Sequence, residues 1–177
     1  MREVQQSISI HASKEDVWDI VFNKFGHVND FNPLIEGSHF LNGENGFVGC
    51  ERQCAIDSKT MVQERITRAE AGLNFDIEIF EGGLPMMDKM TARFDLVELS
   101  SDKTEVLFTM SYSTKPAFMG GLMKGKMAKF FMKLLIGLKY HLETGELVSK
   151  QNIREIEKQF KSLEAGASFE ASMQLVS

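Results

Sequence analysis

Residues 122–148 read LMKGKMAKFFMKLLIGLKYHLETGELV. Large side chains recur in this stretch at steps of three and four residues, which is the spacing of one face of an α-helix. That face carries Met123, Met127, Phe130, Phe131, Leu134, Leu138, His141 and Leu142. A helix of about 27 residues would be roughly 40 Å long. We therefore predict a long amphipathic helix, in which Gly137 and Gly145 allow close packing or a kink.

The region before this helix, residues 35–114, has a different period. Apolar and polar residues alternate there, and turn-forming sequences such as residues 42–46 and 100–103 divide it into short segments. These segments predict six consecutive strands, and alternation over residues 3–11 predicts one more. Short connections between consecutive strands are typical of an antiparallel meander.

Two short helices are predicted between the first strand and this meander. Ser13 has the chemistry of a helix N-cap, and Asp16 follows three residues later. An apolar stripe from Val17 to Phe25 has helical spacing, and Gly26 can end the helix. Residues 27–34 form a second short helical or irregular segment.

These elements together predict an α+β fold. A seven-stranded curved antiparallel sheet would wrap around the long C-terminal helix, with two short helices after the first strand. One helix cannot fill the concave face of a sheet of this size, so we expect an apolar cavity between them. The 14 Phe and 11 Met residues suit such a cavity, and they equally suit a filled core.

Composition excludes several classes of function. A net charge of −5 with mixed signs argues against a nucleic-acid partner. Cys50 and Cys54 are too few for a disulfide framework, and a cytoplasmic protein is expected. The chain has no metal-ligand spacing, phosphate loop or dinucleotide motif, so neither a metal nor a cofactor is expected. No apolar run approaches the roughly 20 residues of a membrane span.

A series of short motifs runs through the first 148 residues. They are ASKEDVW at 12–18, FNPLI at 31–35, VG and ER within 48–52, VQER at 62–65 and EGGLP at 81–85. In this order they resemble the START-like superfamily (SRPBCC, or helix-grip fold), and within it the polyketide cyclase/dehydrase-type branch. The chain departs from the family pattern at Phe31, where Trp is frequent, and in its longer ending after Val148.

The resemblance covers about residues 3–148 and implies the helix-grip fold with a pocket for a small hydrophobic ligand. It does not settle an activity, because members include lipid carriers, hormone binders, aromatic cyclases and chaperone cofactors. We predict a START-like domain over residues 1–148. Residues 149–177 are predicted to form a helical extension followed by a tail, whose sequence pattern favours no regular structure. An apolar seam in the extension either docks on a second copy, giving a homodimer, or folds back on its own chain.

The expected ligand-binding residues combine the inward positions of strands and helix. They are Phe31, Arg52, Glu64, Phe75, Ile77, Met87, Phe94, Phe108, Met110, Tyr112, Met127, Phe130, Phe131, Leu134 and His141. Phe31 and residues 84–87 are expected at the mouth of the pocket, where loops can move.

Arg52 and Glu64 form the most informative pair. By alternation both point inward from neighbouring strands, and a buried charge needs a partner, so we predict an ion pair at the pocket wall. Three interpretations stay open: a structural bridge, a pair that orients ligand, and a register shift that places both residues in solvent.

His141 and Tyr112 are weaker polar candidates. His141 has the chemistry of a general base or polar anchor, or it is a satisfied, partly exposed histidine. The Tyr112 hydroxyl either orients a ligand carbonyl or reaches solvent from ordinary packing.

Five lysines, at positions 124, 126, 129, 133 and 139, occur with no acidic residue between Met119 and Leu142. They indicate either a solvated helix face or a face that binds anionic membrane.

The favoured function is binding of a lipid-like, aromatic or polyketide-like molecule, as carrier or sensor. One alternative is a cyclase, dehydratase or hydrolase-type enzyme with Glu64 or His141 as acid or base. Another is an interaction protein similar to chaperone cofactors or toxin-type members of the superfamily.

Overall fold

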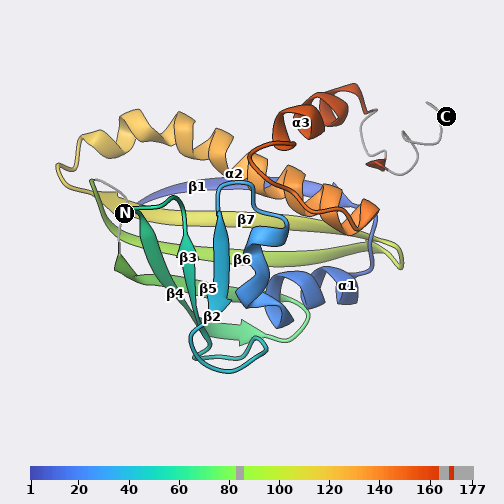
Figure 1. The fold of residues 1–177 in the computed structure, drawn as a ribbon, viewed down its shortest axis with the longest axis horizontal. Helices are drawn as coiled ribbons and strands as arrows, with labels where there is room; N and C mark the ends of the chain where they lie inside the picture. The colour runs from blue at the N-terminus through green and yellow to red at the C-terminus, as the bar shows by residue number, and fades with distance from the viewer. Residues whose placement is uncertain (83–85, 164–167, 170–177) are drawn as a thin grey trace.

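A curved antiparallel sheet organises the computed structural model (Figure 1), which describes residues 1–82, 86–163 and 168–169. Within this part of the chain, seven strands pair in the order β1-β7-β6-β5-β4-β3-β2. They are β1 (Arg2–Ile10), β2 (Gly37–Phe40), β3 (Glu51–Ala55), β4 (Met61–Glu70), β5 (Asn74–Gly82), β6 (Met87–Ser100) and β7 (Lys103–Thr114). The six-strand meander and the predicted α+β fold are confirmed, and β1 is the edge strand that pairs with β7.

The helical elements follow the predicted order. They are α1 (Lys14–Trp18), a π-helical turn η1 (Asp19–Asn23), a 3-10 segment η2 (Phe25–Asp30), α2 (Met119–Thr144) and α3 (Ile153–Ser162). Ser13 Oγ accepts a hydrogen bond from the Asp16 backbone N–H at 3.1 Å, as expected of an N-cap. The long helix begins three residues earlier than predicted and ends earlier, because Gly145 takes a left-handed conformation with φ of 75°.

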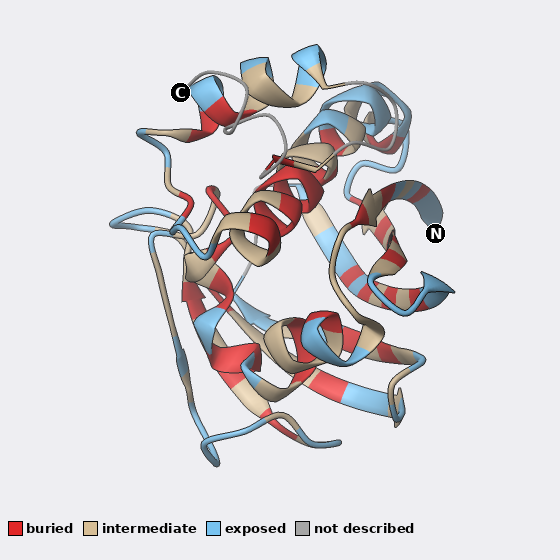
Figure 2. Cartoon of the chain, turned by 90° about the vertical axis from the view of Figure 1, so that its right-hand side faces the viewer, coloured by how far each residue is buried: buried red, intermediate tan, exposed pale blue. Residues whose placement is uncertain are grey.

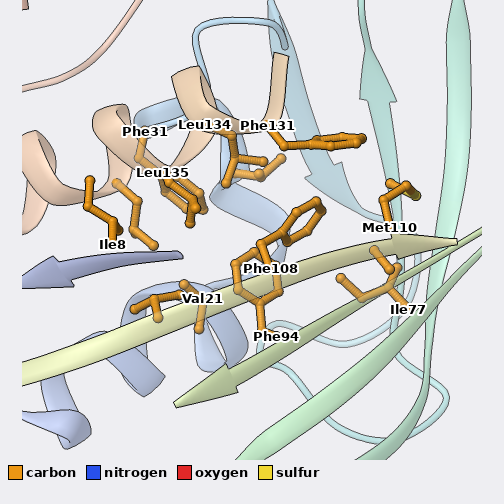
Figure 3. Packing of buried hydrophobic residues seen from close by; sticks show 14 of the residues in the cluster. Ile8, Val21, Phe31, Ile77, Phe94, Phe108, Met110, Phe131, Leu134 and Leu135 are labelled. Carbon is orange, nitrogen blue, oxygen red and sulfur yellow. The ribbon is translucent and has the colours of Figure 1, made fainter. Parts of the chain in front are cut away.

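The long helix α2 lies along one side of the sheet and not across its middle. It contacts β1 and β7, whereas η2 packs against β2 and β3. Aromatic rings on the concave face of the sheet occupy much of the space between α2 and η2. Among them, Phe94 lies directly opposite Phe108 in the register of β6 and β7. Figure 3 shows Phe131 and Leu134 of α2 facing Phe108 and Met110 of the sheet.

Burial differs between the two halves of α2 (Figure 2). From Leu134 to Lys139 every residue is buried, whereas most residues from Gly121 to Lys126 are exposed. The buried half also packs closely on a loop, because a methyl group on Gly137 would overlap the backbone carbonyl of Phe31. Gly137 therefore serves close packing, one of the two roles that the sequence allowed.

Replacing Gly137 by Ala should destabilise the protein by about 1–3 kcal/mol, because the added methyl overpacks against backbone that cannot rotate away. Gly125→Ala is the matched control, since a methyl at Gly125 meets nothing within 4 Å. That variant should gain about 0.5–1 kcal/mol from helix propensity. Urea unfolding measures both changes, and equal effects of the two variants would contradict the packing role.

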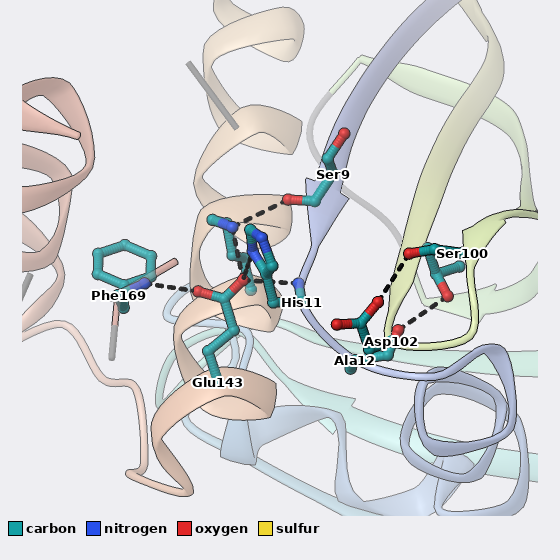
Figure 4. A network of polar contacts seen from close by, with 9 residues as sticks. Ser9, His11, Ala12, Ser100, Asp102, Glu143 and Phe169 are labelled. Carbon is teal, nitrogen blue, oxygen red and sulfur yellow. Dashed lines mark hydrogen bonds and ion pairs between the residues drawn. The ribbon is translucent and has the colours of Figure 1, made fainter. Parts of the chain in front are cut away.

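A buried polar cluster ties the C-terminal half of α2 to β1 (Figure 4). Lys139 Nζ donates to Glu143 Oε1 at 2.5 Å and to the Ser9 carbonyl at 3.0 Å. Glu143 also accepts from the backbone N–H groups of His11 and Phe169, both at 2.8 Å. Burial lowers the pKa of Lys139, and the Glu143 carboxylate opposes that shift. Lys139 is thus buried and links α2 to β1. The sequence groups it with four other lysines on a solvated or membrane-binding face of the helix, and for Lys139 this prediction is wrong.

Glu143→Gln should cost about 3–5 kcal/mol in the free energy of unfolding at neutral pH, because it leaves the Lys139 ammonium buried without a counter-charge. Adding Lys139→Met to the same chain should recover part of the loss, since no charge then remains to be compensated. Denaturant titrations of the single and double variants measure the difference. A double variant less stable than the single one would contradict this account.

The extension after α2 folds back onto its own chain. Ile153 and Ile156 of α3 are buried, and Lys133 of α2 pairs with Glu157 of α3 at 3.2 Å. The apolar seam that suggested a homodimer is therefore used within the monomer, against α2. Phe169 is buried beside Tyr140, with ring centroids 5.1 Å apart, and the rest of the predicted tail lies outside the described residues. The division between residues 148 and 149 stays a prediction.

None of the helices in the described part of the chain combines the length and hydrophobicity that crossing a membrane requires.

Candidate ligand cavity

An apolar cavity of about 120 Å³ lies between α2, the concave face of the sheet and the η1–η2 region. Its wall consists of Val21, Val28, Phe31, Asn32, Ile35, Arg52, Cys54, Ile56, Glu64, Ile77, Ile79, Met90, Ala92, Phe94, Phe108, Met110, Met127, Phe130, Phe131 and Leu134. All but four of these side chains are apolar or a methionine thioether. Strand alternation directs the sheet residues inward, and the spacing of Met127, Phe131 and Leu134 turns one face of α2 toward them.

The aromatic part of the wall is a series of touching rings. Phe94 and Phe108 lie 4.8 Å apart between centroids, and Phe108 and Phe131 lie 5.0 Å apart. Tilted and edge-on arrangements at these distances are favourable beyond simple burial. The rings hold α2 at a defined height above the sheet, which leaves the cavity beside them.

Arg52 and Glu64 form the predicted ion pair at the cavity wall. They are directly opposite in the register of β3 and β4, and Arg52 Nε donates to Glu64 Oε2 at 2.6 Å. Arg52 Nη1 donates to the Phe25 carbonyl at 2.6 Å, and its guanidinium lies 3.8 Å from the centre of the Phe25 ring. Arg52 therefore anchors η2 to the sheet, and the pair is not displaced into solvent.

Only one of the two carboxylate oxygens of Glu64 takes part in these contacts. Its Oε2 receives the bonds from Arg52 and a weak one from the Cys54 thiol at 3.8 Å. Its Oε1 accepts no hydrogen bond from any residue that the structure describes, and the side chain is 16% exposed. A carboxylate oxygen without a protein donor is thus available on a wall residue of the cavity.

Asn32 and Cys54 are the other polar wall residues. Asn32 Oδ1 accepts from the Leu34 backbone N–H at 3.1 Å, which fixes the orientation of the amide. Its amide nitrogen makes no hydrogen bond within the described residues. Burial raises the pKa of the Cys54 thiol to about 11, so this cysteine is a neutral wall group at physiological pH.

Most of the residues that the sequence assigned to the ligand meet at this cavity. Phe31, Arg52, Glu64, Ile77, Phe94, Phe108, Met110, Met127, Phe130, Phe131 and Leu134 all line it. Their role in binding stays a prediction. Four other assigned residues lie elsewhere.

His141 lies outside the cavity. Its Nδ1 donates to the Glu146 carbonyl at 2.9 Å, and its ring stacks on Phe31 with centroids 6.5 Å apart. It faces a surface groove shared with His27 and Asp30. The helical spacing placed His141 on the inner face, but Phe31 occupies the space between that position and the cavity.

Tyr112, Phe75 and Met87 also lie off the cavity wall. The Tyr112 hydroxyl donates to the Gly120 carbonyl at 2.8 Å and thereby holds the first turn of α2 against β7. Phe75 is packed under Trp18 and Phe22. Met87 is half-buried at the start of β6, and the expected mouth residues 84 and 85 lie outside the described residues.

Sequence reasoning missed nine wall residues. They are Val21, Val28, Asn32, Ile35, Cys54, Ile56, Ile79, Met90 and Ala92. The strand members among them have the alternation that identified their neighbours. Val21 of η1 belongs to the apolar helical stripe from Val17 to Phe25, but that stripe does not indicate which of its members reaches the cavity. The residues of η2 and the following loop carry no period, because an irregular segment does not repeat.

The match to known families agrees with this geometry. The family model described as "Polyketide cyclase / dehydrase and lipid transport" matches residues 1–143. The chain belongs to this family. The match ends within the last turn of α2, so α3 lies beyond the part that the family shares. A search of curated protein sequences finds no match for the chain.

Solved structures share the fold. A START superfamily protein from Mycobacterium smegmatis has a TM-score of 0.63 and 19% identity, covering 79% of this chain and 98% of its own. Norcoclaurine synthase from Thalictrum flavum, in complex with dopamine and hydroxybenzaldehyde, has a TM-score of 0.57 and 15% identity, covering 76% and 83%. The di-domain ARO/CYC BexL has a TM-score of 0.61 and 16% identity, covering 81% of this chain and 47% of its own. These likenesses confirm the helix-grip fold.

Proposed function

We propose that the protein binds a small, mainly apolar molecule that carries a hydroxyl or phenol group, as a carrier or sensor. The observation that carries this proposal is the cavity lined by Phe, Met and Ile side chains with the Glu64 carboxylate in its wall. Concave, mainly apolar sites with a few polar groups are the usual form of small-molecule sites. The family description includes lipid transport, which supports the same class of ligand.

The size of the cavity limits the ligand. A dry apolar cavity of roughly 150 Å³ holds benzene in another protein, so about 120 Å³ suits a single ring or a short chain. Two-ring ligands such as naphthol require the wall to move. Met90, Met110 and Met127 give the wall that freedom, because the unbranched methionine side chain repacks easily.

The polar part of the wall favours a hydrogen-bond donor over an anion on the ligand. The charge of Arg52 is already matched by Glu64 and its donors bind protein groups, so a ligand carboxylate would meet the negative charge of Glu64. A hydroxyl can instead donate to Glu64 Oε1. The phenolic compounds bound to norcoclaurine synthase, which has the same fold, are of this chemical type.

The rival proposal is an enzyme of cyclase, dehydratase or hydrolase type. The family description and Glu64 support it, since a carboxylate at an apolar wall can act as acid or base. His141 lies off the wall, so such chemistry would fall to Glu64. A homodimer and a cytoplasmic setting stay predictions. Turnover of a bound ligand by the wild type that Glu64→Gln abolishes would favour the enzyme over the carrier.

Filling the cavity should abolish binding without unfolding the protein. Ala92 is buried in the wall, and Ala92→Leu adds bulk directly into the cavity. Naphthol fluorescence titration should show at least a tenfold loss of affinity. Thr91→Leu adds the same side chain at the neighbouring exposed position of β6 and should bind naphthol as the wild type does. Equal binding by both variants would place the naphthol site elsewhere.

Glu64→Gln should reduce the preference for a ligand hydroxyl. A hydrogen bond to a charged group contributes about 1.5–3 kcal/mol, so the wild type should bind naphthol about tenfold or more tightly than naphthalene. Glutamine keeps the shape and an acceptor for Arg52 but loses the charge, so the ratio should fall while naphthalene affinity stays constant. An unchanged naphthol-to-naphthalene ratio would rule out Glu64 as the acceptor.

A further inference from the structure

The first half of α2 carries an outward face that combines apolar and basic side chains. Phe118 and Leu122 are 69% and 71% exposed. Lys126 and Lys129 follow at positions four and seven residues after Leu122, which places them on the same side of the helix. Lys124 is also exposed, but it lies two residues after Leu122 and therefore on the opposite side of the helix. We call Phe118, Leu122, Lys126 and Lys129 the basic face of α2.

The lysines of the basic face have no counter-charge in the described part of the chain. Lys133 pairs with Glu157 and Lys139 with Glu143, but Lys124, Lys126 and Lys129 form no ion pair there. No acidic residue occurs between Met119 and Leu142. A local positive surface on a protein of net charge −5 is unusual enough to need an explanation.

The start of α2 adds to this positive character. Its first turn contains no acidic residue and has no side-chain cap, and the N–H groups of Met119, Gly120 and Gly121 donate to backbone carbonyls of residues 116–118. No negative side chain in this turn offsets the positive end of the helix dipole beside Phe118. Figure 1 places this half of α2 at the end of the molecule where the N-terminus of the chain also lies.

We infer that the basic face of α2 docks on an anionic lipid bilayer. The exposed apolar side chains supply area that a bilayer can bury, and the lysines beside them attract anionic lipid, which are the two contributions that determine the binding of a helix at a membrane interface. Phe118 and Leu122 enter the headgroup boundary, and the lysines meet lipid phosphates. Nucleic acid or an acidic protein would attract the lysines but gives no role to the two exposed apolar side chains.

Docking in this orientation places the cavity close to the bilayer. Met127 and Phe130 line the cavity from the same turns of α2 that carry Lys126 and Lys129 outward. An apolar ligand would then have a short path between lipid and cavity. That last step rests on the proposed function, whereas vesicle binding itself does not.

The test is co-sedimentation of the full chain with vesicles of phosphatidylcholine, alone or with phosphatidylglycerol. Binding should require phosphatidylglycerol and weaken as salt is raised. Each lysine near an anionic surface is worth about fivefold in affinity, so Lys126→Gln/Lys129→Gln should lose roughly 30-fold. Phe118→Ala/Leu122→Ala should lose binding while keeping the lysines.

Two controls match these changes elsewhere on the surface. Lys59→Gln/Lys161→Gln removes the same charge from exposed positions outside α2, and Leu99→Ala/Leu147→Ala removes two exposed leucines. Both should bind vesicles as the wild type does. Naphthol binding in solution should be unchanged in all four variants, which separates this test from that of the cavity.

Three results would overturn the proposal. One is equal binding to vesicles with and without phosphatidylglycerol, and another is equal loss in the α2 lysine variant and its charge control. The third is binding to polyglutamate as tight as to the vesicles and independent of Phe118 and Leu122, which would identify an acidic polypeptide as the occupant.

Discussion

The concave face of a seven-stranded sheet must be covered, and a single long helix is too narrow to cover it. α2 solves half of the problem by lying over β1 and β7, where rings such as Phe108 and Phe131 fix its height. The other half is covered by η2, which Arg52 anchors to β3 through the Phe25 carbonyl. The cavity is the space left where these two covers meet, so it follows from the architecture and not from any one side chain.

Two largely buried ion pairs among the described residues serve this arrangement in different ways. Burying charges is costly, and each pair offsets that cost by bonding to backbone groups of other elements. Lys139 and Glu143 bind β1 and Phe169, so they fix one end of α2. Arg52 binds η2, and Glu64 Oε1 accepts no hydrogen bond from the residues that the structure describes. Only the second pair combines a structural role with an open position for a ligand.

The burial of α2 therefore differs between its two halves as well as between its two faces. Its C-terminal half is buried on nearly all sides and is held by Gly137 against the Phe31 backbone. Its N-terminal half is buried on one face only, where Met127 and Phe130 line the cavity. In the described part of the chain, the opposite face of that half is exposed, which leaves it available to a surface partner. A ligand in the cavity and a bilayer on the surface would thus contact the same helical turns.

The sequence by itself determined the strand order, the long helix, the inward position of Arg52 and Glu64 and most of the aromatic wall. Those features follow from local periods, because alternation and helical spacing report which side of an element is buried. The tertiary structure alone decided what each inward residue meets. His141 is screened from the cavity by Phe31, the Tyr112 hydroxyl is taken by Gly120, and Lys139 is buried against β1. A period identifies the buried side of an element, but the neighbour that fills that side comes from a distant part of the chain.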